Sequence, residues 1–288
     1  MVKVDNAIIM AAGVSSRFSP LSHEIPKCLV SVKGEILIER QIRQLQEKGI
    51  QEIVVVTGYK HEMLSYLKDM FGVILVHNND FYIRNNHSSI HAAREYLNNS
   101  YVCSSDNYYS VNPFEPEVDD SFYSTVFVDG ATKEWCVEVD SNDVIQKVTI
   151  GGHDSWVMLG HTFWSKDFSR KFLSVLDKVY NHPETYSKLW ESIYIDHIDE
   201  LPMKIRRYEP NCIYEFDSID ELRRFDYSYI TDTKSQIIKD VAHQLHIPEA
   251  QINRIEPIFK GNDAIGFTFY YQLQKYQYLY DTKQLSSL

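Results

Sequence analysis

Apolar residues in the first hundred positions occur as short continuous runs that alternate with amphipathic stretches. The runs predict strands covered on both faces, over residues 7–12, 52–58, 72–78 and 101–106. The stretches between them predict helices over about 36–48, 60–70 and 88–97. Such alternation predicts a Rossmann-like α/β fold, whose mixed but mostly parallel sheet is flanked by helices. Ligands bind at the carboxyl ends of the strands in such sheets, here Gly13, Gly58, Asn78 and Asp106.

The pattern changes between residues 121 and 164 to short alternating strands separated by turn residues such as Asp129-Gly130. We expect a small antiparallel layer over the ligand-binding edge. Further elements follow, with helices at about 165–180 and 187–199, a strand near 203–208 and a strand–helix pair over 213–225. The last residues predict a helix and a hairpin, an α+β appendage. We therefore expect a main domain over 1–228 and a small accessory segment over 229–288.

Composition limits the classes of partner. The 288 residues suit one large domain with an appendage. A net charge of −11 argues against a nucleic-acid or anionic membrane partner, and no apolar stretch has the length of a bilayer span. Four cysteines without a CxxC pair, and no targeting segment before the first strand, predict reduced thiols in a cytoplasmic protein: Cys28, Cys103, Cys136 and Cys212.

The loop after the first strand carries groups suited to a phosphate. Gly13 is expected to adopt a positive φ that lets backbone N–H groups converge on an anion. Ser15 and Ser16 add hydroxyl donors, Arg17 a planar fork and Lys27 a compact second charge. The structural alternative is an ordinary strand–loop–helix turn with solvated cations.

Two aspartates lie where a metal would be needed. Asp106 ends the fourth strand, and Asp217 lies in the motif EFD more than a hundred residues later. Two carboxylates at the ligand-binding edge can hold Mg²⁺ against the α-phosphate of a nucleotide. The structural alternatives are a strand-end turn for Asp106 and a helix N-cap for Asp217, with Ser218 as the other N-cap candidate.

These motifs together resemble a known superfamily. The stretch AIIMAAGVSSRFSPLSHEIPKCLV resembles the signature loop of the nucleotidyltransferases that make sugar and alcohol nucleotides, and it is most similar to that of the bacterial CTP:phosphocholine cytidylyltransferases and their phosphonate-specific relatives. Further matching motifs follow in the family's order, over about residues 1–228: ERQIRQLQEKGIQEIVVVTGY, NNHSSIHAAREYL, YVCSSDNY, EWCVEVD, LWESI and YEFDSIDEL. Ser15 is a departure, because sugar-nucleotide members more often carry glycine there.

The resemblance implies a fold of the nucleotide-diphospho-sugar transferase type and an enzymatic activity. It implies Mg²⁺-dependent transfer of the cytidylyl group of CTP to phosphocholine, or to a related aminoalkyl phosphate or phosphonate, with release of pyrophosphate. A role in cell-surface modification is implied as well. Arg17 and Lys27 would be catalytic, and Asp106 and Asp217 would hold the metal. The residues expected to bind the nucleotide are Ala11, Ala12, Gly13, Ser15, Ser16, Thr57, Gly58, Tyr59, Asn85, Asn86, Ser89 and Ser105.

The acceptor pocket is expected to combine aromatic faces with a carboxylate, because a quaternary ammonium group binds both. Trp135 aligns with the aromatic residue that choline-specific relatives use. The remaining candidates are Trp156, Trp190, Glu191, Tyr214 and Glu215. Each tryptophan has a core position as its structural alternative. Aminoethylphosphonate or phosphoethanolamine would instead require hydrogen-bonding carboxylates, such as Glu191 or Asp154, so the sequence leaves the acceptor open.

Two other functions stay open. A sugar-1-phosphate nucleotidyltransferase would have a polar acceptor pocket, whereas tryptophan and tyrosine lie in that region here. A catalytically silent nucleotide-binding regulator would lack the catalytic lysine or the aspartates, and this chain has both. Four histidines have no metal-ligand spacing and are expected to be solvated or in the core: His87, His91, His153 and His161. The tail faintly resembles the first strands of choline-kinase-like phosphotransferases without their catalytic lobe, which suggests a docking or oligomerisation element and a homodimer.

Overall fold

The computed structural model describes residues 1–261 and 263–288. Its residues form two compact units, and neither is continuous in sequence. The first unit comprises Met1–Gly13 and Ile38–Glu215, and the second comprises Val14–Leu37 and Phe216–Leu288. The loop that carries Ser15 and Arg17 therefore shares a unit with the C-terminal residues. The 1–228 and 229–288 division stays a prediction.

A seven-stranded sheet forms the centre of the first unit, in the order β12-β10-β11-β7-β2-β5-β6. The pairs that join β7, β2, β5 and β6 are parallel, whereas β11 is antiparallel to both β7 and β10. The bounds are β2 (Asn6–Ala11), β5 (Ile53–Thr57), β6 (Ile74–His77), β7 (Ser100–Ser104), β10 (Phe122–Val139), β11 (Ile145–Trp164) and β12 (Lys204–Tyr208). The predicted fold class, a mostly parallel sheet flanked by helices, is confirmed.

Every residue of β5 is buried, because helices cover both faces of this sheet. One large core joins side chains of β7, β10 and β11 to three helices through residues such as Ile90, Phe172 and Ile193. The helices of the first unit are α2 (Leu37–Glu47), α3 (Tyr66–Phe71), α4 (His87–Ala92), α5 (Lys166–Val179) and α6 (Trp190–Asp196). Two short pairs complete the unit: β1 (Val2–Lys3) with β9 (Glu117–Val118), and β8 (Asn107–Tyr109) with β13 (Ile213–Glu215).

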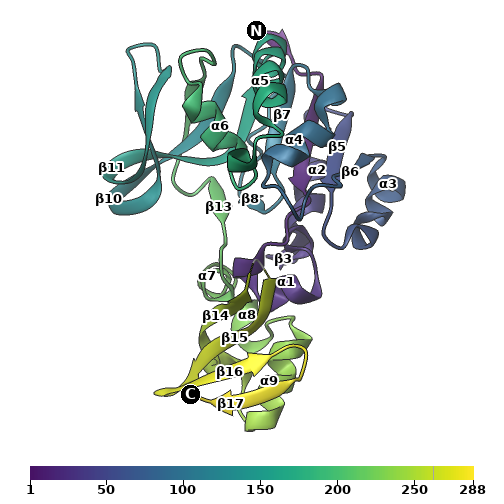
Figure 1. The fold of residues 1–288 in the computed structure, drawn as a ribbon, viewed down its shortest axis with the longest axis vertical. Coiled ribbons are helices and arrows are strands. Elements are labelled where there is room, and N and C mark those ends of the chain that lie inside the picture. The colour runs from purple at the N-terminus through teal and green to yellow at the C-terminus, as the bar shows by residue number, and fades with distance from the viewer. Residues whose placement is uncertain (262) are drawn as a thin grey trace. The chain divides into compact units, whose positions relative to one another are not determined.

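The region predicted as several short antiparallel strands consists of two long ones. β10 and β11 have 18 and 20 residues and form a hairpin that extends well beyond the other strands of the sheet (Figure 1). The turn residues Asp129 and Gly130 are absorbed within β10, where the register of the pair shifts between Val128 and Ala131. A turn signal here marks a bulge, which bends a strand without ending it.

The second unit combines the early loop with the C-terminal residues. The loop contains η1 (Ser16–Phe18), α1 (Leu21–Glu24), η2 (Lys27–Leu29), β3 (Ser31–Val32) and β4 (Glu35–Ile36). The C-terminal part contains α7 (Ile219–Phe225), α8 (Ser228–Thr231), α9 (Gln236–Leu245), β14 (Asn253–Lys260), β15 (Asp263–Tyr271), β16 (Gln274–Leu279) and β17 (Gln284–Ser287). The tail is thus a four-stranded antiparallel sheet (Figure 1) and not the predicted hairpin. Within this sheet, Tyr271 and Gln274 pair across the tight turn between β15 and β16.

Within residues 1–261 and 263–288, no helix combines the length and the apolar character needed to cross a membrane.

Candidate active site

Between Gly13 and Lys27, one residue lies in the left-handed region, and it is Ser15. Ser15 has φ of 52° and is the N-cap of η1. Gly13 was expected to supply the positive φ, but its φ lies outside that region and the space beside its Cα is open. Serine tolerates this conformation at a cost of about 1 kcal/mol, whereas glycine adopts it freely. The position where many sugar-nucleotide enzymes carry glycine is therefore the one that needs a left-handed backbone.

Arg17, Lys27 and Asp217 come together in the second unit. Arg17 donates from Nη1 to Oδ2 of Asp217 at 2.7 Å, and the Nζ atom of Lys27 lies 3.7 Å from Oδ1 of the same carboxylate. The Lys27 side chain is only 6% exposed, whereas that of Arg17 is 74% exposed. One cation is thus fixed in the interior and the other is free to reorient toward an anion. Guanidinium and ammonium groups such as these both bind phosphate oxygens.

The side chain of Asp217 does not cap the helix that follows it. Ser218 is the N-cap of α7, and its Oγ accepts from the backbone N–H of Glu221 at 3.2 Å. The carboxylate of Asp217 instead faces the two cations. The helix N-cap, which was the structural alternative for Asp217, is therefore Ser218.

The parallel strands of the first unit bring several predicted nucleotide-binding residues to one edge. Ala11 is opposite Thr57 in the β2–β5 pair, and Ser105 and Asp106 directly follow β7 on the other side of β2. A Cβ atom on Gly58 would lie 2.8 Å from the carbonyl oxygen of Ala12, so only glycine fits there. The backbone N–H of Tyr59 donates to that same oxygen at 3.0 Å. The β2 and β5 ends are therefore locked side by side.

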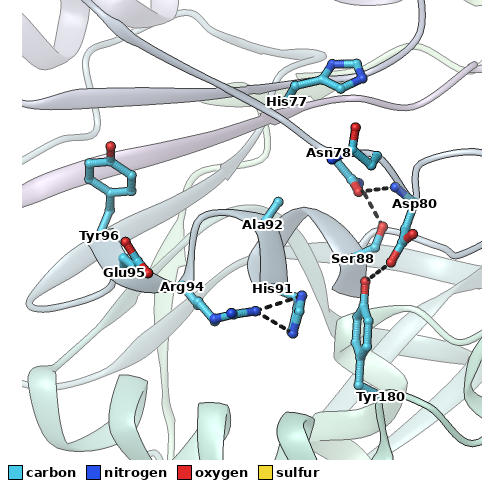
Figure 2. Close-up of a pocket in the computed structure, with 11 residues that line it drawn as sticks. His77, Asn78, Asp80, Ser88, His91, Ala92, Arg94, Glu95, Tyr96 and Tyr180 are labelled. Carbon is cyan, nitrogen blue, oxygen red and sulfur yellow. Dashed lines mark hydrogen bonds between the residues drawn. The ribbon is translucent and has the colours of Figure 1, made fainter.

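The asparagine and serine residues near α4 form a connected polar network. Asn78 donates from Nδ2 to Oγ of Ser88 at 2.8 Å (Figure 2). It also donates to Oγ of Ser89 at 3.3 Å. Asn85 donates to the backbone carbonyl of Ser187 at 3.0 Å. Ser89 is thus held by hydrogen bonds within the first unit, with its side chain buried.

A cavity of about 380 Å³ lies beside this network. Figure 2 shows it with Asp80 and Tyr180 hydrogen-bonded at 2.5 Å and Arg94 donating to the His91 ring. None of the residues predicted to bind the nucleotide or the acceptor lines it. The cavity therefore plays no part in the function considered below.

Asn86, Glu191 and Tyr123 form a second cluster, which lies in the first unit. Asn86 occupies the N-cap position of α4, but its side chain makes no capping bond. Its Nδ2 donates to Oε2 of Glu191 at 3.2 Å, and its Oδ1 accepts from the backbone N–H of Trp190 at 2.7 Å. Tyr123 donates its hydroxyl to Oε1 of Glu191 at 3.2 Å. Both carboxylate oxygens of Glu191 are therefore oriented by neutral donors.

The protonation of this cluster is shifted by its surroundings. Burial raises the pKa of the Glu191 carboxyl to about 7, and the hydrogen bonds from Asn86 and Tyr123 only partly oppose the rise. Burial also raises the pKa of Tyr123, as do the charges of Glu191 and Glu215. A partly buried carboxylate beside aromatic rings, without a cationic side chain bonded to it, is suited to bind a cationic ligand.

The aromatic residues predicted for the acceptor differ in exposure. Trp190 is 1% exposed and stacks on Tyr123, with ring centroids 5.7 Å apart. It supports the ring of Tyr123 from the core side. Trp135 is half-buried on β10. Trp156 packs edge-to-face on Phe127 and lies 5.2 Å from the guanidinium of Arg207.

Tyr214 and Glu215 lie on β13, opposite Tyr108 and Asn107 of β8. Glu215 is exposed, and its charge acts on Tyr123. Asp154 lies in β11, where Oδ1 accepts from the backbone N–H of Gly130 at 2.6 Å. The hydrogen bond from Gly130 is the main reason that the pKa of Asp154 is lowered. Asp154 thus has a structural role within the hairpin.

Tyr123, which contacts Glu191 in this cluster, was not predicted from the sequence. The residue lies in an alternating strand with nothing to distinguish it from a core aromatic. Its signal was its position on β10, the strand that also carries Trp135. Both side chains contribute to the same core, and Tyr123 is the one that reaches Glu191.

The histidines occupy structural positions. His87 and His161 are fully buried. Burial lowers the pKa of His161 to about 3, so this ring is neutral at physiological pH. His153 is exposed. Across residues 1–261 and 263–288, no group of three or more His, Cys, Asp or Glu side chains is placed to hold a metal ion.

Comparison with known proteins gives the class of this chain and then its family. Residues 7–106 match the MobA-like NTP transferase domain. The solved structure of CTP:phosphocholine cytidylyltransferase from Streptococcus pneumoniae (LicC) superposes with a TM-score of 0.75 at 35% identity, covering 79% of this chain and 99% of that one. The fold and the loop therefore define a nucleotidyltransferase, and the chain is an enzyme of that class.

Two curated relatives narrow the class. A choline-phosphate cytidylyltransferase from Streptococcus pneumoniae is 36% identical over 220 residues, which are 76% of this chain and 96% of that protein. A 2-aminoethylphosphonate cytidylyltransferase from Lancefieldella rimae is 34% identical over 229 residues, which are 78% of this chain and 93% of that protein. The chain belongs to the nucleotidyltransferase family that contains these cytidylyltransferases, as its motifs predicted.

Proposed function

We propose that this chain transfers the cytidylyl group of CTP to phosphocholine or a closely related aminoalkyl phosphate or phosphonate, with Mg²⁺ as cofactor. The observation that carries the proposal is the convergence of Arg17 and Lys27 of the signature loop on Asp217. It fits the family of the chain, whose relatives at 34–36% identity are named for these two acceptors. The predicted roles of the site residues follow from it as proposals.

The reaction joins an acceptor oxygen to the α-phosphorus of CTP. A phosphate or phosphonate oxygen of the acceptor attacks in line, the bond from the α-phosphorus to the bridging oxygen breaks, and pyrophosphate leaves with the electron pair. Positioning and charge neutralisation dominate such a reaction, because it requires little covalent participation by the protein. Lys27, fixed in the interior, would hold the triphosphate in place. Arg17, which is more exposed, would stabilise the negative charge that develops on the leaving pyrophosphate.

Asp106 and Asp217 are the proposed metal ligands. Carboxylate oxygens are the ligands that Mg²⁺ prefers, and a nucleotide-bound Mg²⁺ needs only one or two of them because phosphates and water complete the shell. Two aspartates would therefore be enough protein ligands for this cofactor. When bound, Mg²⁺ supplies charge neutralisation at the α-phosphate and at the leaving pyrophosphate.

The nucleotide would be recognised mainly by small polar groups and backbone. The sugar and base would lie along the ends of β2 and β5, where Gly58 leaves room for close approach of the backbone. Cytosine presents an exocyclic amine and a carbonyl, which hydroxyls, amides and backbone groups can pair. The proposed nucleotide-binding residues are Ala11, Ala12, Gly13, Ser15, Ser16, Thr57, Gly58, Tyr59, Asn85, Asn86, Ser89 and Ser105.

The acceptor's cationic group is proposed to bind at Glu191. Its carboxylate is oriented by Asn86 and Tyr123, and Trp190 supports the Tyr123 ring from the core side. A trimethylammonium group would contact aromatic faces and the carboxylate without donating hydrogen bonds, whereas a primary ammonium would donate to the carboxylate. The remaining proposed acceptor residues are Trp135, Trp156, Tyr214 and Glu215.

Three wider expectations belong to this proposal. Within residues 1–261 and 263–288 the four cysteines form no disulfide, which is typical of a reducing compartment and supports a cytoplasmic location. The CDP-alcohol product is an activated donor suited to cell-surface modification. Exposed apolar side chains in the accessory segment 229–288, Phe259 and Leu273, support a homodimer. Light scattering tests that last expectation directly.

A substrate panel tests the proposal. Pyrophosphate release is measured for CTP, UTP, ATP and GTP, each with phosphocholine, phosphoethanolamine, 2-aminoethylphosphonate and glucose-1-phosphate. We expect turnover with CTP and an aminoalkyl acceptor, dependent on Mg²⁺ and abolished by EDTA. Turnover with glucose-1-phosphate alone would instead assign a sugar-nucleotide enzyme, and no turnover with any pair would favour a silent nucleotide-binding regulator.

A further inference from the structure

The loop with the two catalytic cations is built into the C-terminal part of the chain. Val14–Leu37 and Phe216–Leu288 form one compact unit, in which η1 contacts β14. The match to the choline-phosphate cytidylyltransferase covers 96% of that protein but 76% of this chain. About a quarter of this chain therefore lies outside the match.

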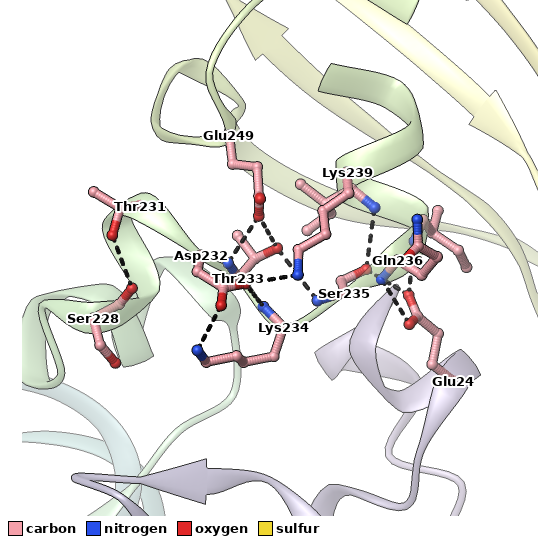
Figure 3. A network of polar contacts seen from close by, with 12 residues as sticks. Glu24, Ser228, Thr231, Asp232, Thr233, Lys234, Ser235, Gln236, Lys239 and Glu249 are labelled. Atoms are coloured by element: carbon pink, nitrogen blue, oxygen red, sulfur yellow. Dashed lines mark hydrogen bonds and ion pairs between the residues drawn. The ribbon is translucent and has the colours of Figure 1, made fainter. Parts of the chain in front are cut away.

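Glu24 makes the most extensive of these contacts (Figure 3). Its Oε1 accepts from the Ser235 hydroxyl at 2.5 Å and from the backbone N–H of Ile237 at 3.0 Å, and its Oε2 accepts from the backbone N–H of Gln236 at 2.8 Å. These donors belong to the first turn of α9, a helix of ten residues. A carboxylate at a helix N-terminus satisfies N–H groups that have no partner within the helix and interacts favourably with its dipole.

Tyr280 makes a second attachment. Its ring stacks on His23, with centroids 4.0 Å apart and an interplanar angle of 18°. Its hydroxyl forms a hydrogen bond with the hydroxyl of Ser19. The Tyr280 backbone N–H donates to the carbonyl of Ile265 at 2.9 Å, so the ring is anchored to β15. Both attachments come from the accessory segment 229–288.

The far end of the loop is fixed by Asp226, which lies before this segment, and by Tyr229, the first residue of the segment. The backbone N–H of Lys33 donates to Oδ2 of Asp226 at 2.7 Å. Within the segment, Tyr229 donates its hydroxyl to the carbonyl of Ser31 at 2.7 Å. The loop is therefore held on both sides of Lys27, and Glu24 is the nearest of the attached residues to that lysine in sequence.

Lys27 depends on this restraint because its side chain is buried among close neighbours. Its side chain is 6% exposed, with Nζ 3.7 Å from Asp217 and 5.6 Å from the Phe18 ring centroid. If the loop moved by about 1 Å, the Lys27 ammonium would move away from its position beside the triphosphate. A displacement of this size can lower the rate about a hundredfold. Only Ile25 and Pro26 separate Glu24 from Lys27, so little of a displacement at Glu24 can be absorbed between them.

We propose that Glu24 is a positioning residue for CTP, through which the C-terminal segment 229–288 holds Lys27 in place. This inference rests on the proposed function. It assigns the accessory segment a role in catalysis, exerted through Glu24 and reinforced by the Tyr280 stack on His23. Neither Glu24 nor Tyr280 is a catalytic residue.

The test compares two charge-neutralising variants within the second unit. Glu24→Gln keeps the shape of the side chain but replaces one acceptor oxygen with an NH₂ group, which would face the donors of α9. Glu249→Gln is the matched control, since the Glu249 carboxylate accepts from the backbone N–H and hydroxyl of Thr233, which lies outside the loop (Figure 3). Initial rates are measured against CTP and against phosphocholine, and thermal unfolding is measured for each variant.

Glu24→Gln is expected to raise the KM for CTP by about tenfold with the KM for phosphocholine unchanged, because a displaced loop affects the triphosphate alone. Glu249→Gln is expected to leave both unchanged. A wild-type KM for CTP in Glu24→Gln would overturn the inference. An equal rise in both variants would overturn it as well, since that would show general loosening of the unit.

A second pair of variants covers the case in which Glu24→Gln does not fold. Tyr280→Ala removes the stack on His23, whereas Tyr280→Phe retains it, so the CTP affinity is expected to fall in the first and recover in the second. Calorimetric titration with CTP and Mg²⁺ measures this affinity without turnover. If the wild type binds CTP but turns over no acceptor, the proposed function fails, while the comparison of Glu24→Gln with wild type still tests the inference.

Discussion

We expect the carboxyl of Glu191, the proposed binding group for the cationic end of the acceptor, to make acceptor binding dependent on pH. Burial raises its pKa to about 7, so the charged form that binds a cation is favoured above that pH. About one-tenth of the free enzyme carries the charge at pH 6 and about nine-tenths at pH 8. We therefore expect kcat/KM for phosphocholine to rise about tenfold between these values and to level off above them.

Glu191→Gln isolates this contribution from the ionisation of the substrates. The glutamine keeps the size of the side chain and is neutral throughout, so the ratio of wild-type to variant kcat/KM removes the titration of phosphocholine and CTP. The expected ratio increases with pH through about 7. A ratio that is flat from pH 6 to 8 would refute the assignment of Glu191 to the acceptor.

Tyr123→Phe sharpens the test. Its hydroxyl donates to Glu191 and lowers the pKa of the carboxyl, so its loss is expected to move the midpoint of the profile upward by up to about one pH unit. Tyr180→Phe is the matched control, because the Tyr180 hydroxyl bonds Asp80 in a different part of the first unit. An unchanged midpoint in Tyr123→Phe would contradict the hydrogen-bonded arrangement.

Three further predictions concern the loop and the strand ends. Lys27→Ala is expected to lower kcat/KM at least about a hundredfold, the usual scale for one transition-state charge, and near-normal pyrophosphate release would contradict its role. Gly58→Ala is expected to destabilise the fold by about 1–3 kcal/mol and to weaken CTP binding. The reason is that the new methyl group would lie 2.7 Å from Phe81 Cγ and 2.8 Å from the Ala12 carbonyl oxygen. Denaturant unfolding measures the loss of stability. Ser15→Val should cost about 1–2 kcal/mol because a β-branched residue is strained at φ of 52°, whereas Ser15→Gly should not, and equal melting temperatures for the two variants would refute the strain argument.

The central sheet could be predicted from the sequence because its information is local. Continuous apolar runs gave β2 and β5 within a residue of their observed ends. The long hairpin could not be predicted in the same way, because Asp129 and Gly130 have the composition of a turn. Whether such a pair ends a strand or bends it depends on the partner strand, here β11, whose register is set far along the chain.

The candidate site was predictable by residue type and less so by geometry. Arg17, Lys27 and Asp217 were all identified, and the structure brings them together. The left-handed position was predicted at Gly13 because glycine has no side chain, but the loop takes that conformation at Ser15, because backbone geometry depends on how the whole loop packs. The contacts of Glu24 with α9 could not be inferred, since nothing local distinguishes this residue from a solvated one.

The discontinuous second unit has a consequence for the order in which the protein is made. Glu24 and Ser235 are 211 residues apart in sequence, so their contact closes one of the longest loops in the chain. At the usual pace of synthesis, roughly 10–40 s separate the emergence of these two segments from the ribosome. The strands of the first unit can pair during that interval, while the Lys27 loop still lacks its partner. The capacity to bind the triphosphate is therefore expected to be acquired last, after the sheet that is proposed to bind the base has formed.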